Sequence, residues 1–396
     1  MNNQNQIKIR TRFAPSPTGF LHVGGLRTAL YNYLFAKKHG GEFILRLEDT
    51  DTARTVPGSA TYIVDALNWL GITPDEGYGF SKNSWEYQQS IQKEEGIYND
   101  YAQLLIDTGW AYYAFDTPEE LDAMRQKFGE EGGFVKLPDG GELMVPTGYS
   151  FMTRVEMNNS LTLPEDVVNQ RIADGVPYVI RFRNPGNLNN KIIVNDMIRG
   201  RVEFNAALVD DKVLVKADGM PTYHLAHLVD DIEMDITHVI RGEEWLPSTP
   251  LHIMLYQALG HTPPKFAHLP LVLKPAPHKG KLSKRDGTSL GIPIFPFSFT
   301  NDDGSVSAGY VEQGYYSQAI VNMMALLGWN PGSGSEKEIF SMQELIDTFD
   351  LSQVHKAGAK YNPDKTKWFN QQYLRMKSDA DLAGEFLRSK SFEPYV

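Results

Sequence analysis

The first fifty residues show a strand, a helix and a second strand in their pattern of apolar and polar positions. Residues 7–13, IKIRTRF, alternate strictly between two faces, as a half-buried β-strand does. After the turn APSPTG, apolar residues recur at helical spacing, namely Leu26, Ala29, Leu30, Tyr33 and Leu34. The segment His39-Gly40-Gly41 ends this helix, and a strand-like run, EFILRLED, follows at 42–49. Together these elements predict a βαβ unit and therefore a parallel sheet.

Further elements of the same kind follow after residue 205. Two strands are predicted at 212–216 (KVLVK) and 237–241 (THVIR). Ser248 is expected to cap a helix with an apolar stripe formed by Leu251, Met254, Leu255, Ala258 and Leu259. Beyond about residue 315 the segments QAIVNMMALLGW and SMQELIDTF predict amphipathic helices, and 291–314 is predicted to be an inserted loop or hairpin.

Residues 112–205 break the strand–helix alternation. They mix short strands with glycine-rich turns such as EEGG and PDGGE. We therefore expect an α/β protein with an α+β module inserted into a parallel-sheet domain and a mostly helical part after it.

Composition and charge narrow the possible functions. The 396 residues include no cysteine, which excludes a disulfide framework, cysteine-ligated zinc, an iron–sulfur cluster and a thiol nucleophile. The formal net charge is −11, so nucleic-acid binding would require a locally basic face. The start MNNQNQIKIR lacks the apolar core of a signal peptide, and no run of about 18 apolar residues occurs. We expect a soluble, cytoplasmic protein that does not enter a membrane.

A first candidate site joins the first strand to the first helix, in FAPSPTGFLHVGG at 13–25. Open α/β folds bind ligands at such turns, at the carboxyl end of a parallel sheet. Gly24 and Gly25 would let a base or phosphate approach the backbone, and His22 could donate to phosphate oxygens at the helix start. On HVGG alone, a loop with an incidental histidine would be the favoured interpretation, but the place of this segment between strand and helix favours the ligand site.

A second candidate site is KLSKR at 281–285, which lies between Gly280 and Gly287. Three cations in five residues suit a loop that clamps a polyphosphate. The alternative is a solvated basic loop, the commoner fate of such runs. The motif G-x-x-x-x-G-K-[ST] is absent from the sequence, which argues against P-loop hydrolysis.

HVGG and KLSKR, in this order, resemble the two signature motifs of class I aminoacyl-tRNA synthetases. Longer segments are similar to glutamyl-tRNA synthetases: RTRFAPSPTGFLHVGGLRTALYNYLFAKKHGGEFILRLEDTD, DGMPTYHLAHLVDDIEMDITHVIRGEEWLPSTPLH and LGWNPG. The matching segments are spread over about 7–370. The resemblance implies a Rossmann-type catalytic domain that activates L-glutamate with ATP and transfers it to the 3′ end of tRNA(Glu), with release of AMP and pyrophosphate.

The resemblance also implies a glutamate pocket made of Arg12, Ala14, Ser16, Glu48, Tyr223, His227 and Arg241. Arg12 would meet the side-chain carboxylate and Glu48 the ammonium group, while Tyr223 and Arg241 would hydrogen-bond and charge-pair with the substrate. Without the resemblance, Tyr223 would be core packing and Arg241 a surface charge. The role of His227 stays open, because some relatives carry asparagine there.

For ATP, the resemblance implies contacts from His22, Gly24, Gly25, Glu244, Trp245, Lys281, Ser283 and Lys284. The catalytic residues would be His22, Lys281 and Lys284, with Lys284 placed for transition-state charge. Mg²⁺ would accompany the phosphates. The spacing His224-x-x-His227 could hold a metal, but packing or substrate contact is favoured because no third ligand is near in sequence. Zinc is not expected, because the cysteine ligands of some relatives are absent.

The resemblance divides the chain into five parts. Residues 1–111 and 206–260 would form the two halves of the Rossmann-type domain, and 112–205 an inserted acceptor-stem-binding module. Residues 261–378 would form a stem-contact module with the KLSKR loop. Only 379–396 remain for the anticodon-binding region of full-length relatives, so we expect a shortened form of the enzyme.

A tRNA surface is predicted near the end of the chain. Residues 353–377 carry six Lys or Arg and one Asp, with aromatic residues interleaved. Candidate phosphate contacts are Lys356, Lys360, Lys365 and Lys367. The alternative is a solvated helix face over a small aromatic core.

Three alternatives to this enzyme remain open: a glutaminyl-type synthetase, a short paralogue that glutamylates a modified tRNA base, and a non-catalytic tRNA- or nucleotide-binding relative. APSPTG and GGLRTAL favour the glutamyl type, and the residues beyond 330 argue against the short paralogue. Intact His22, Glu48, Arg241 and Lys284 argue against lost chemistry. We expect a monomer with tRNA(Glu), L-glutamate and ATP as partners.

Overall fold

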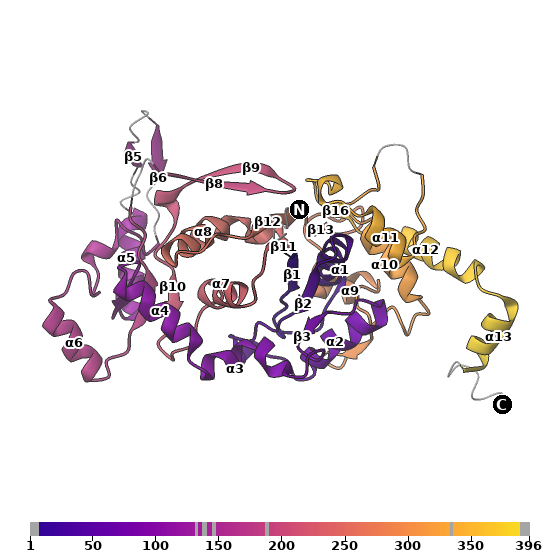
Figure 1. The fold of residues 1–396 in the computed structure, drawn as a ribbon, viewed down its shortest axis with the longest axis horizontal. Coiled ribbons are helices and arrows are strands. Elements are labelled where there is room, and N and C mark those ends of the chain that lie inside the picture. The colour runs from indigo at the N-terminus through magenta and orange to yellow at the C-terminus, as the bar shows by residue number, and fades with distance from the viewer. Residues whose placement is uncertain are drawn as a thin grey trace, which may run out of the picture. The chain divides into compact units, whose positions relative to one another are not determined.

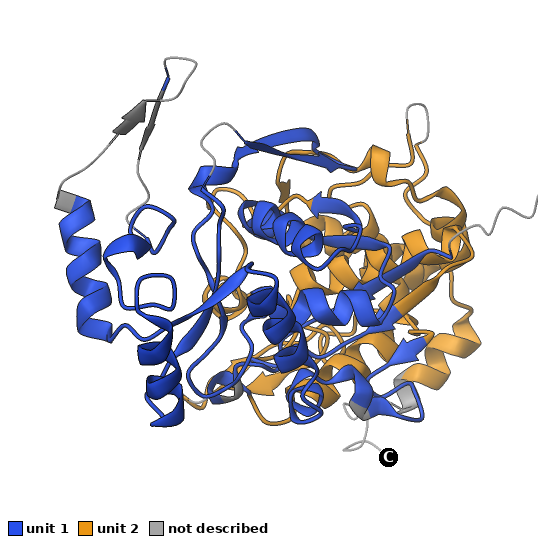
Figure 2. Ribbon diagram, turned by 60° about the vertical axis from the view of Figure 1, so that its left-hand side comes forward, with its two compact units in different colours: residues 1–18, 44–55, 76–268 blue, residues 19–43, 56–75, 269–396 orange. Residues whose placement is uncertain are grey.

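The computed structural model divides into two compact units, which Figure 2 shows in blue and orange. Unit 1 comprises residues 1–18, 44–55 and 76–268, and unit 2 comprises residues 19–43, 56–75 and 269–396. The described residues are 8–130, 134–136, 141–144, 148–186, 190–301, 303–332 and 336–388. Residue 7 of the predicted first strand, parts of the EEGG and PDGGE turns, and 389–396 of the predicted last region lie outside them.

Most of a five-stranded sheet lies in unit 1, with the strand order β12-β11-β1-β2-β3 (Figure 1). Its strands are β1 (Arg10–Phe13), β2 (Glu42–Leu45), β3 (Glu76–Gly77), β11 (His238–Gly242) and β12 (Lys265–Leu269). β1 pairs with β11 in parallel, and so does β2 with β3. The predicted parallel sheet is therefore confirmed. The strand predicted at 42–49 was too long: it ends at Leu45, after which Leu47 makes only an isolated bridge to Gln88.

Helices of unit 1 supply much of its apolar core. They are α3 (Gln89–Glu94), α4 (Ile97–Asp107), α5 (Pro118–Glu130), α6 (Glu165–Ala173), α7 (Tyr223–Glu233) and α8 (Thr249–Ala258). The predicted stripe of α8 is confirmed, because Leu251, Met254 and Leu255 are buried in the main cluster with the apolar residues of α7. Ser248 is the N-cap residue of α8, as predicted, but its side chain makes no capping hydrogen bond. The 3-10 turn Glu243–Ser248 runs directly into α8, so the backbone of Ser248 is already helical.

The segment from 111 to 215 forms a second, antiparallel sheet in unit 1. Its strand order is β10-β7-β4, with the bounds β4 (Ala111–Ala114), β7 (Val179–Phe182) and β10 (Val213–Val215). The strand predicted at 212–216 exists as β10, but it pairs with β7 and not with the parallel sheet. Two hairpins accompany this sheet, β5 (Phe134–Lys136) with β6 (Glu142–Met144) and β8 (Lys191–Asp196) with β9 (Gly200–Asn205).

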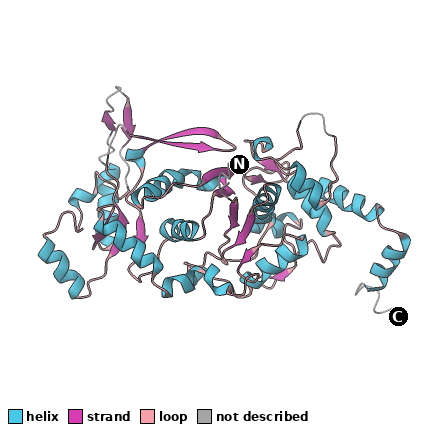
Figure 3. Cartoon of the chain, viewed as in Figure 1, coloured by secondary structure: helices cyan, strands magenta, loops and turns pink. Residues whose placement is uncertain are grey.

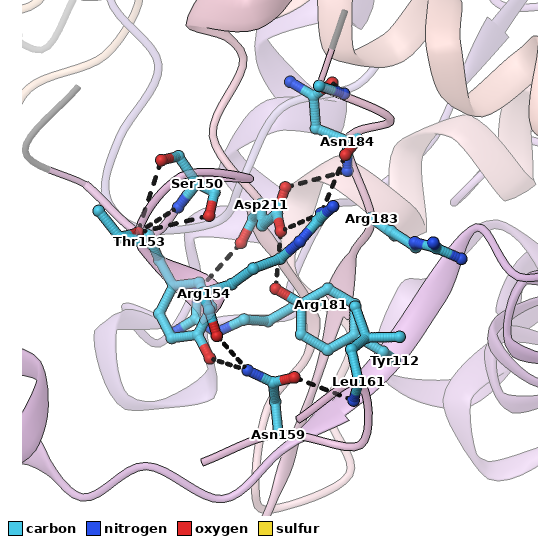
Figure 4. A network of polar contacts seen from close by, with 12 residues as sticks. Tyr112, Ser150, Thr153, Arg154, Asn159, Leu161, Arg181, Arg183, Asn184 and Asp211 are labelled. Atoms are coloured by element: carbon cyan, nitrogen blue, oxygen red, sulfur yellow. Dashed lines mark hydrogen bonds and ion pairs between the residues drawn. The ribbon is translucent and has the colours of Figure 1, made fainter. Parts of the chain in front are cut away.

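A buried polar network, shown in Figure 4, joins the strands and loops of this second sheet. Asp211 accepts hydrogen bonds from the Tyr112 hydroxyl at 2.7 Å, from Arg154 Nη1 at 2.9 Å and from the backbone N–H of Asn184 at 2.9 Å. Burial raises the pKa of Asp211, although Arg154 and Tyr112 oppose this effect. One carboxylate thus ties three separate segments, so the module is held by polar contacts as well as by its small apolar core.

Unit 2 is mainly helical (Figure 3). Its helices are α1 (Val23–Lys38), α2 (Ser59–Leu70), α9 (Lys284–Leu290), α10 (Ser317–Ala325), α11 (Met342–Thr348), α12 (Pro363–Arg375) and α13 (Asp379–Arg388). α1 packs against α10 and α11. It ends as predicted, with His39 as C-cap and Gly40 in the left-handed region at φ +63°.

The remaining elements of unit 2 are short strands. β13 (Val272–Leu273) pairs in parallel with β16 (Ala359–Lys360), and β14 (Phe299–Thr300) forms a hairpin with β15 (Val306–Ser307). The hairpin predicted within 291–314 and the two helices predicted after 315 are therefore confirmed. In the described part of the chain, we find no helix with the length and apolarity that crossing a membrane requires.

Candidate active site

A cluster of buried charges lies at the carboxyl edge of the unit 1 sheet. Arg12 comes from the end of β1, Arg46 and Glu48 follow β2, and Asp231 comes from α7. Arg12 donates from Nε to Asp231 Oδ1 at 3.0 Å and from Nη2 to Oδ2 at 3.2 Å. Arg46 donates from Nη1 to Asp231 Oδ1 at 2.8 Å and from Nη2 to Glu48 Oε1 at 2.9 Å. One buried carboxylate thus holds two guanidinium groups beside Glu48.

The carboxylates of this cluster differ in their preference for charge. Burial alone would raise the pKa of Asp231, but Arg12 and Arg46 hold it well below its ordinary value. Burial raises the pKa of the neighbouring Asp230 to about 6, although Arg46 opposes it. Burial also raises the pKa of Glu48, against the effect of Arg46 and Arg12. Asp231 is therefore the most readily ionised of the three carboxylates.

Arg241, the fourth residue of β11, extends the same site. Its Nη1 donates to the Tyr223 hydroxyl at 3.1 Å. Tyr223 stacks on His227 at 4.4 Å between ring centroids, and Trp245 lies 4.3 Å away. Burial raises the pKa of Tyr223, so the phenol stays protonated and, since it accepts from Arg241, its own O–H remains for another acceptor. Arg241 and Tyr223 thus form a pair of donors suited to a carboxylate.

The other residues predicted for the pocket lie in loops at its edge. Ala14 is half-buried and Ser16 is exposed, and the loop between them receives a backbone hydrogen bond from Glu48 N–H to Pro15 O at 3.1 Å. Glu244 and Trp245, which were predicted for ATP, lie in the 3-10 turn after β11 and are both exposed, Trp245 to 38%. Unit 1 contains all seven residues predicted for the glutamate pocket. Tyr223 contacts Arg241 and His227, and Arg12 is linked to Glu48 through Asp231 and Arg46.

Unit 2 contains both signature motifs. His22 is the N-cap of α1, and its Nδ1 accepts from the backbone N–H of Gly24 at 2.9 Å. Since Nδ1 accepts, the neutral ring carries its proton on Nε2, as a donor. A Cβ at Gly24 would come within 2.7 Å of His22 Cε1, which explains the glycine at this position.

The centre of the KLSKR segment is buried and hydrogen-bonded, whereas its lysines lie at the surface. Leu282 is buried, and its N–H donates to Val272 O at 2.8 Å. Ser283 forms a capping box with Asp286, whose carboxylate also pairs with Lys274 at 2.8 Å. Lys281 and Lys284 are exposed along their length, but Lys284 Nζ lies over Gly19, where a Cβ would be only 2.8 Å away. Loss of water around this ammonium group lowers the pKa of Lys284.

The lysines and aromatic residues of the basic segment near α12 differ in their exposure and in their partners. Lys356, Lys360 and Lys367 are exposed, but Lys365 forms an ion pair with Glu338 at 2.6 Å and lies 3.8 Å from the Trp368 ring centroid. The interleaved Tyr361 and Phe369 are both 1% exposed. These aromatic rings belong to a core, whereas Lys356, Lys360 and Lys367 lie at the surface.

Several residues of the site were missed by reading the sequence. They are Arg46, Asp230, Asp231, Thr249, His252 and His268, all buried. Arg46 and Glu48 are two residues apart after β2, a spacing that puts both on one face and could have indicated the pair. The contacts of Asp231 with Arg12 and Arg46 join residues 219 and 185 positions apart, which no local pattern reveals.

The sequence left open a metal site at His224 and His227. In the described part of the chain, no group of three His, Cys, Asp or Glu residues could hold a metal ion. His224 Nδ1 instead faces His252 Nε2 at 3.2 Å, and His227 Nδ1 lies 2.6 Å from Tyr223 O. Burial lowers the pKa of His224 to about 4 and that of His227 well below its ordinary value, so both rings are neutral.

Comparison with known proteins identifies the family of the chain. Residues 8–368 match the family described as tRNA synthetases class I (E and Q), catalytic domain. The glutamate–tRNA ligase of Flavobacterium johnsoniae is 53% identical over 389 residues, 97% of this chain and 74% of that protein. A crystal structure of a glutamate tRNA ligase from Elizabethkingia meningosepticum in complex with its amino acid has a TM-score of 0.86 at 53% identity, covering 96% of this chain and 72% of that chain. The structure of the glutamate-tRNA synthetase from Elizabethkingia anophelis has the same TM-score and identity and covers 96% of this chain and 73% of that chain. With a match over most of its length, the chain belongs to the class I tRNA synthetases of the E and Q type.

Proposed function

We propose that this protein activates L-glutamate with ATP to glutamyl-adenylate and transfers the glutamyl group to the 3′ end of tRNA(Glu), releasing AMP and pyrophosphate. The observation that carries the proposal is the pairing of the buried Arg241 with Tyr223, whose hydroxyl is close enough to Glu48 and Arg12 to be affected by their charges. The relatives at 53% identity named glutamate–tRNA ligase support the choice of substrate.

The charges of the pocket fit an amino acid with an acidic side chain. Arg241 Nη1 and the Tyr223 hydroxyl offer donors to a carboxylate, and Arg12 adds a second guanidinium. Glu48 offers the acceptor that an ammonium group requires. Because these groups are buried and already paired, they are held in place before the substrate arrives, which lowers the cost of binding.

For the nucleotide we propose His22, Gly24 and Gly25 with Lys281, Ser283 and Lys284, and in unit 1 Glu244 and Trp245. ATP would arrive as its magnesium complex, as a substrate. The glutamate α-carboxylate attacks the α-phosphorus, and pyrophosphate leaves. His22, through its Nε2 donor, and Lys284 stabilise the negative charge that develops on the phosphate oxygens. A 3′-terminal tRNA hydroxyl then attacks the activated carbonyl, and AMP leaves.

For tRNA we propose that the inserted module, 112–205, contacts the acceptor stem and that the region 261–378 contacts the stem further on. The exposed Lys356, Lys360 and Lys367 would bind phosphates, while Lys365 would first have to leave Glu338. We also propose residues 1–111 and 206–260 as the two halves of the catalytic domain, 379–396 as the start of a further region, and a cytoplasmic monomer that holds no zinc.

The decisive experiment is ATP–pyrophosphate exchange with L-glutamate, with and without tRNA(Glu), and with L-glutamine in parallel. We expect glutamate-dependent exchange that requires tRNA(Glu). Exchange with glutamine instead would replace the proposal by the glutaminyl type. No exchange in any mixture, together with tight binding of a glutamyl-adenylate analogue, would mean a binding protein that has lost the chemistry.

A further inference from the structure

The guanidinium of Arg241 is oriented by a set of buried side chains outside the predicted site. Its Nε donates to His268 Nε2 at 3.1 Å, and its Nη2 donates to Thr249 Oγ1 at 3.1 Å and to His252 Nδ1 at 3.3 Å. Among the described residues, Tyr223 is the partner of Nη1, so the second N–H of Nη1 can meet a ligand carboxylate. The direction of this N–H depends on what holds the opposite edge of the guanidinium.

His268 is itself held by Asp196, the last residue of β8. Asp196 Oδ2 lies 2.6 Å from His268 Nδ1 and accepts the backbone N–H of His268 at 3.1 Å. Both side chains are buried, His268 completely. A carboxylate beside Nδ1 requires the proton on that nitrogen, which leaves a lone pair on Nε2. The acceptor that Arg241 Nε needs therefore exists because Asp196 selects the tautomer.

The backbone of the β8–β9 hairpin is also bonded to β12, the strand that carries His268. The N–H of Met197 donates to Phe266 O on β12 at 2.8 Å, and β8 lies beside α8 (Figure 1). Asp196 Oδ1 accepts from the N–H groups of Ile198 and Arg199 at 2.9 and 2.8 Å, which closes the turn of the hairpin. Asp196 therefore serves both the turn and the histidine, one oxygen for each.

From these contacts we infer that Asp196 and His268 are positioning residues of the amino-acid pocket: Asp196 sets the tautomer of His268, and His268 orients Arg241 toward the carboxylate of the substrate. This inference rests on the proposed function, since it assigns Arg241 to the amino acid. His268 and Asp196 touch no substrate. Their effect should therefore fall on the Michaelis constant for glutamate and not on the constant for ATP.

The change Asp196→Asn tests the inference most directly. An amide in place of Oδ2 presents N–H to His268 Nδ1 and forces the other tautomer, so that two N–H groups face each other at Arg241. It also removes the acceptor of the backbone N–H of His268, a loss that does not depend on the side chain at 268. Oδ1 can still close the hairpin turn. In exchange assays with tRNA(Glu), we expect the KM for glutamate to rise about tenfold, with kcat and the KM for ATP within about threefold of wild type.

Two substitutions of His268 distinguish the roles of its two ring nitrogens. His268→Gln keeps an acceptor near the place of Nε2 and should stay within about threefold of wild type, whereas His268→Asn loses it and should resemble Asp196→Asn. Gln has no tautomer, so adding Asp196→Asn to His268→Gln should cost only the hydrogen bond to the backbone N–H of residue 268 and should raise the KM for glutamate much less than it does beside His268. An equal effect of Asp196→Asn in both backgrounds, or an unchanged KM for glutamate in Asp196→Asn, would overturn the inference and leave Asp196 a structural residue. Asp218→Asn is the matched control, because Asp218 also accepts a backbone N–H two residues ahead but is exposed.

A second measurement does not depend on activity. Long-range ¹H–¹⁵N spectra of the histidine-labelled protein without substrates report which ring nitrogen of His268 carries the proton. We expect Nδ1 in wild type and Nε2 in Asp196→Asn, and a wild-type proton on Nε2 would overturn the inference. Because the wild-type exchange assay tests the proposed function separately, failure of one proposal is distinguishable from failure of the other.

Discussion

The amino-acid pocket in unit 1 and the signature motifs in unit 2 present their charges in opposite ways. In the pocket, Arg12, Arg46 and Arg241 are each no more than 5% exposed, and each has at least one fixed hydrogen-bond partner. In unit 2, Lys281 and Lys284 are exposed, and their segment is anchored by the buried Leu282 between them. One region keeps its cations buried and oriented, and the other keeps its cations at the surface.

The difference fits the ligands that we propose for the two regions, an amino acid in unit 1 and a polyphosphate in unit 2. Selecting one amino acid requires donors in a fixed direction, because a misplaced or missing partner leaves a buried charge unsatisfied. Binding a polyphosphate requires positive charge that can follow moving oxygens, which a hydrated ammonium on a long stem provides. Substitutions in the pocket should therefore affect folding as well as activity, whereas substitutions in the KLSKR segment should affect activity alone.

The largest effect on stability is expected for Asp231→Asn. The change leaves Arg12 and Arg46 buried beside a neutral amide, and loss of a buried charge partner costs about 3–5 kcal/mol of unfolding free energy. Asp230→Asn is the matched control, because Asp230 is the more weakly paired carboxylate: it lies 3.4 Å from Arg46 Nε, and burial raises its pKa to about 6, so a neutral amide there should cost less. Urea unfolding of both variants measures the difference, and equal losses would refute the distinction between the two carboxylates.

The next effect concerns the KLSKR segment. Lys284→Ala should lower the rate of adenylate formation by about 10²–10³, the usual effect of removing one contact to transition-state charge. The fold should be intact by circular dichroism, since the side chain is exposed. Lys279→Ala, an exposed lysine in the same loop, should behave as wild type. Unchanged activity of Lys284→Ala would remove Lys284 from the proposed mechanism.

The histidines of the pocket predict a pH effect confined to unit 1. Burial lowers the pKa of His224 to about 4 from an ordinary value of 6.5, and His227, His252 and His268 shift in the same direction. As the pH falls below 6.5, the unfolded chain binds these protons before the folded one, so stability is lost toward pH 4. The shifted pKa of His224 alone should lower the free energy of unfolding by about 2 kcal/mol between pH 7 and pH 5.

Two variants separate the contributions to this pH effect. His224→Gln removes one histidine, so its stability should fall less between pH 7 and 5 than that of wild type. Asp230 acts in the opposite direction, because its raised pKa lets the folded state bind a proton first between about 6 and 3.8. Stability should therefore fall more steeply in Asp230→Asn, and urea midpoints that are flat from pH 7 to 5 in all three proteins would contradict the assignment of neutral histidines.

How far the sequence predicts this molecule differs between its local and its long-range features. The strands β1, β2 and β11 and the helices α1, α8, α10 and α11 follow from periodicity, because each buries one face against a core. Ser248 was correctly predicted as the N-cap of α8, but its side chain makes no capping bond, since the preceding turn Glu243–Ser248 is continuous with the helix. Such continuity depends on backbone angles that a serine at the right spacing does not determine.

Prediction of the candidate site from the sequence is likewise limited to its local features. Arg12 and Glu48 could be expected at the carboxyl edge of the sheet, because both follow strands of one βαβ unit. Asp231, His268 and Asp196 could not, since their roles come from contacts with residues far away in the sequence. Buried charge networks are specified by three-dimensional packing. Residues that contact a substrate can therefore be predicted from the sequence more readily than the residues that orient them.

The smallest effect is expected at the basic surface of α12, where two lysines two positions apart differ in their partners. Lys367 is exposed, whereas Lys365 is paired with Glu338 at 2.6 Å. Lys367→Ala should weaken tRNA(Glu) binding by up to about 1 kcal/mol and reduce the dependence of log K on log[salt] by about one phosphate contact. Lys365→Ala should change binding less, because its charge is already neutralised. Binding titrations at several salt concentrations measure both, and a larger effect of Lys365→Ala would mean that the Glu338 pair opens when tRNA binds.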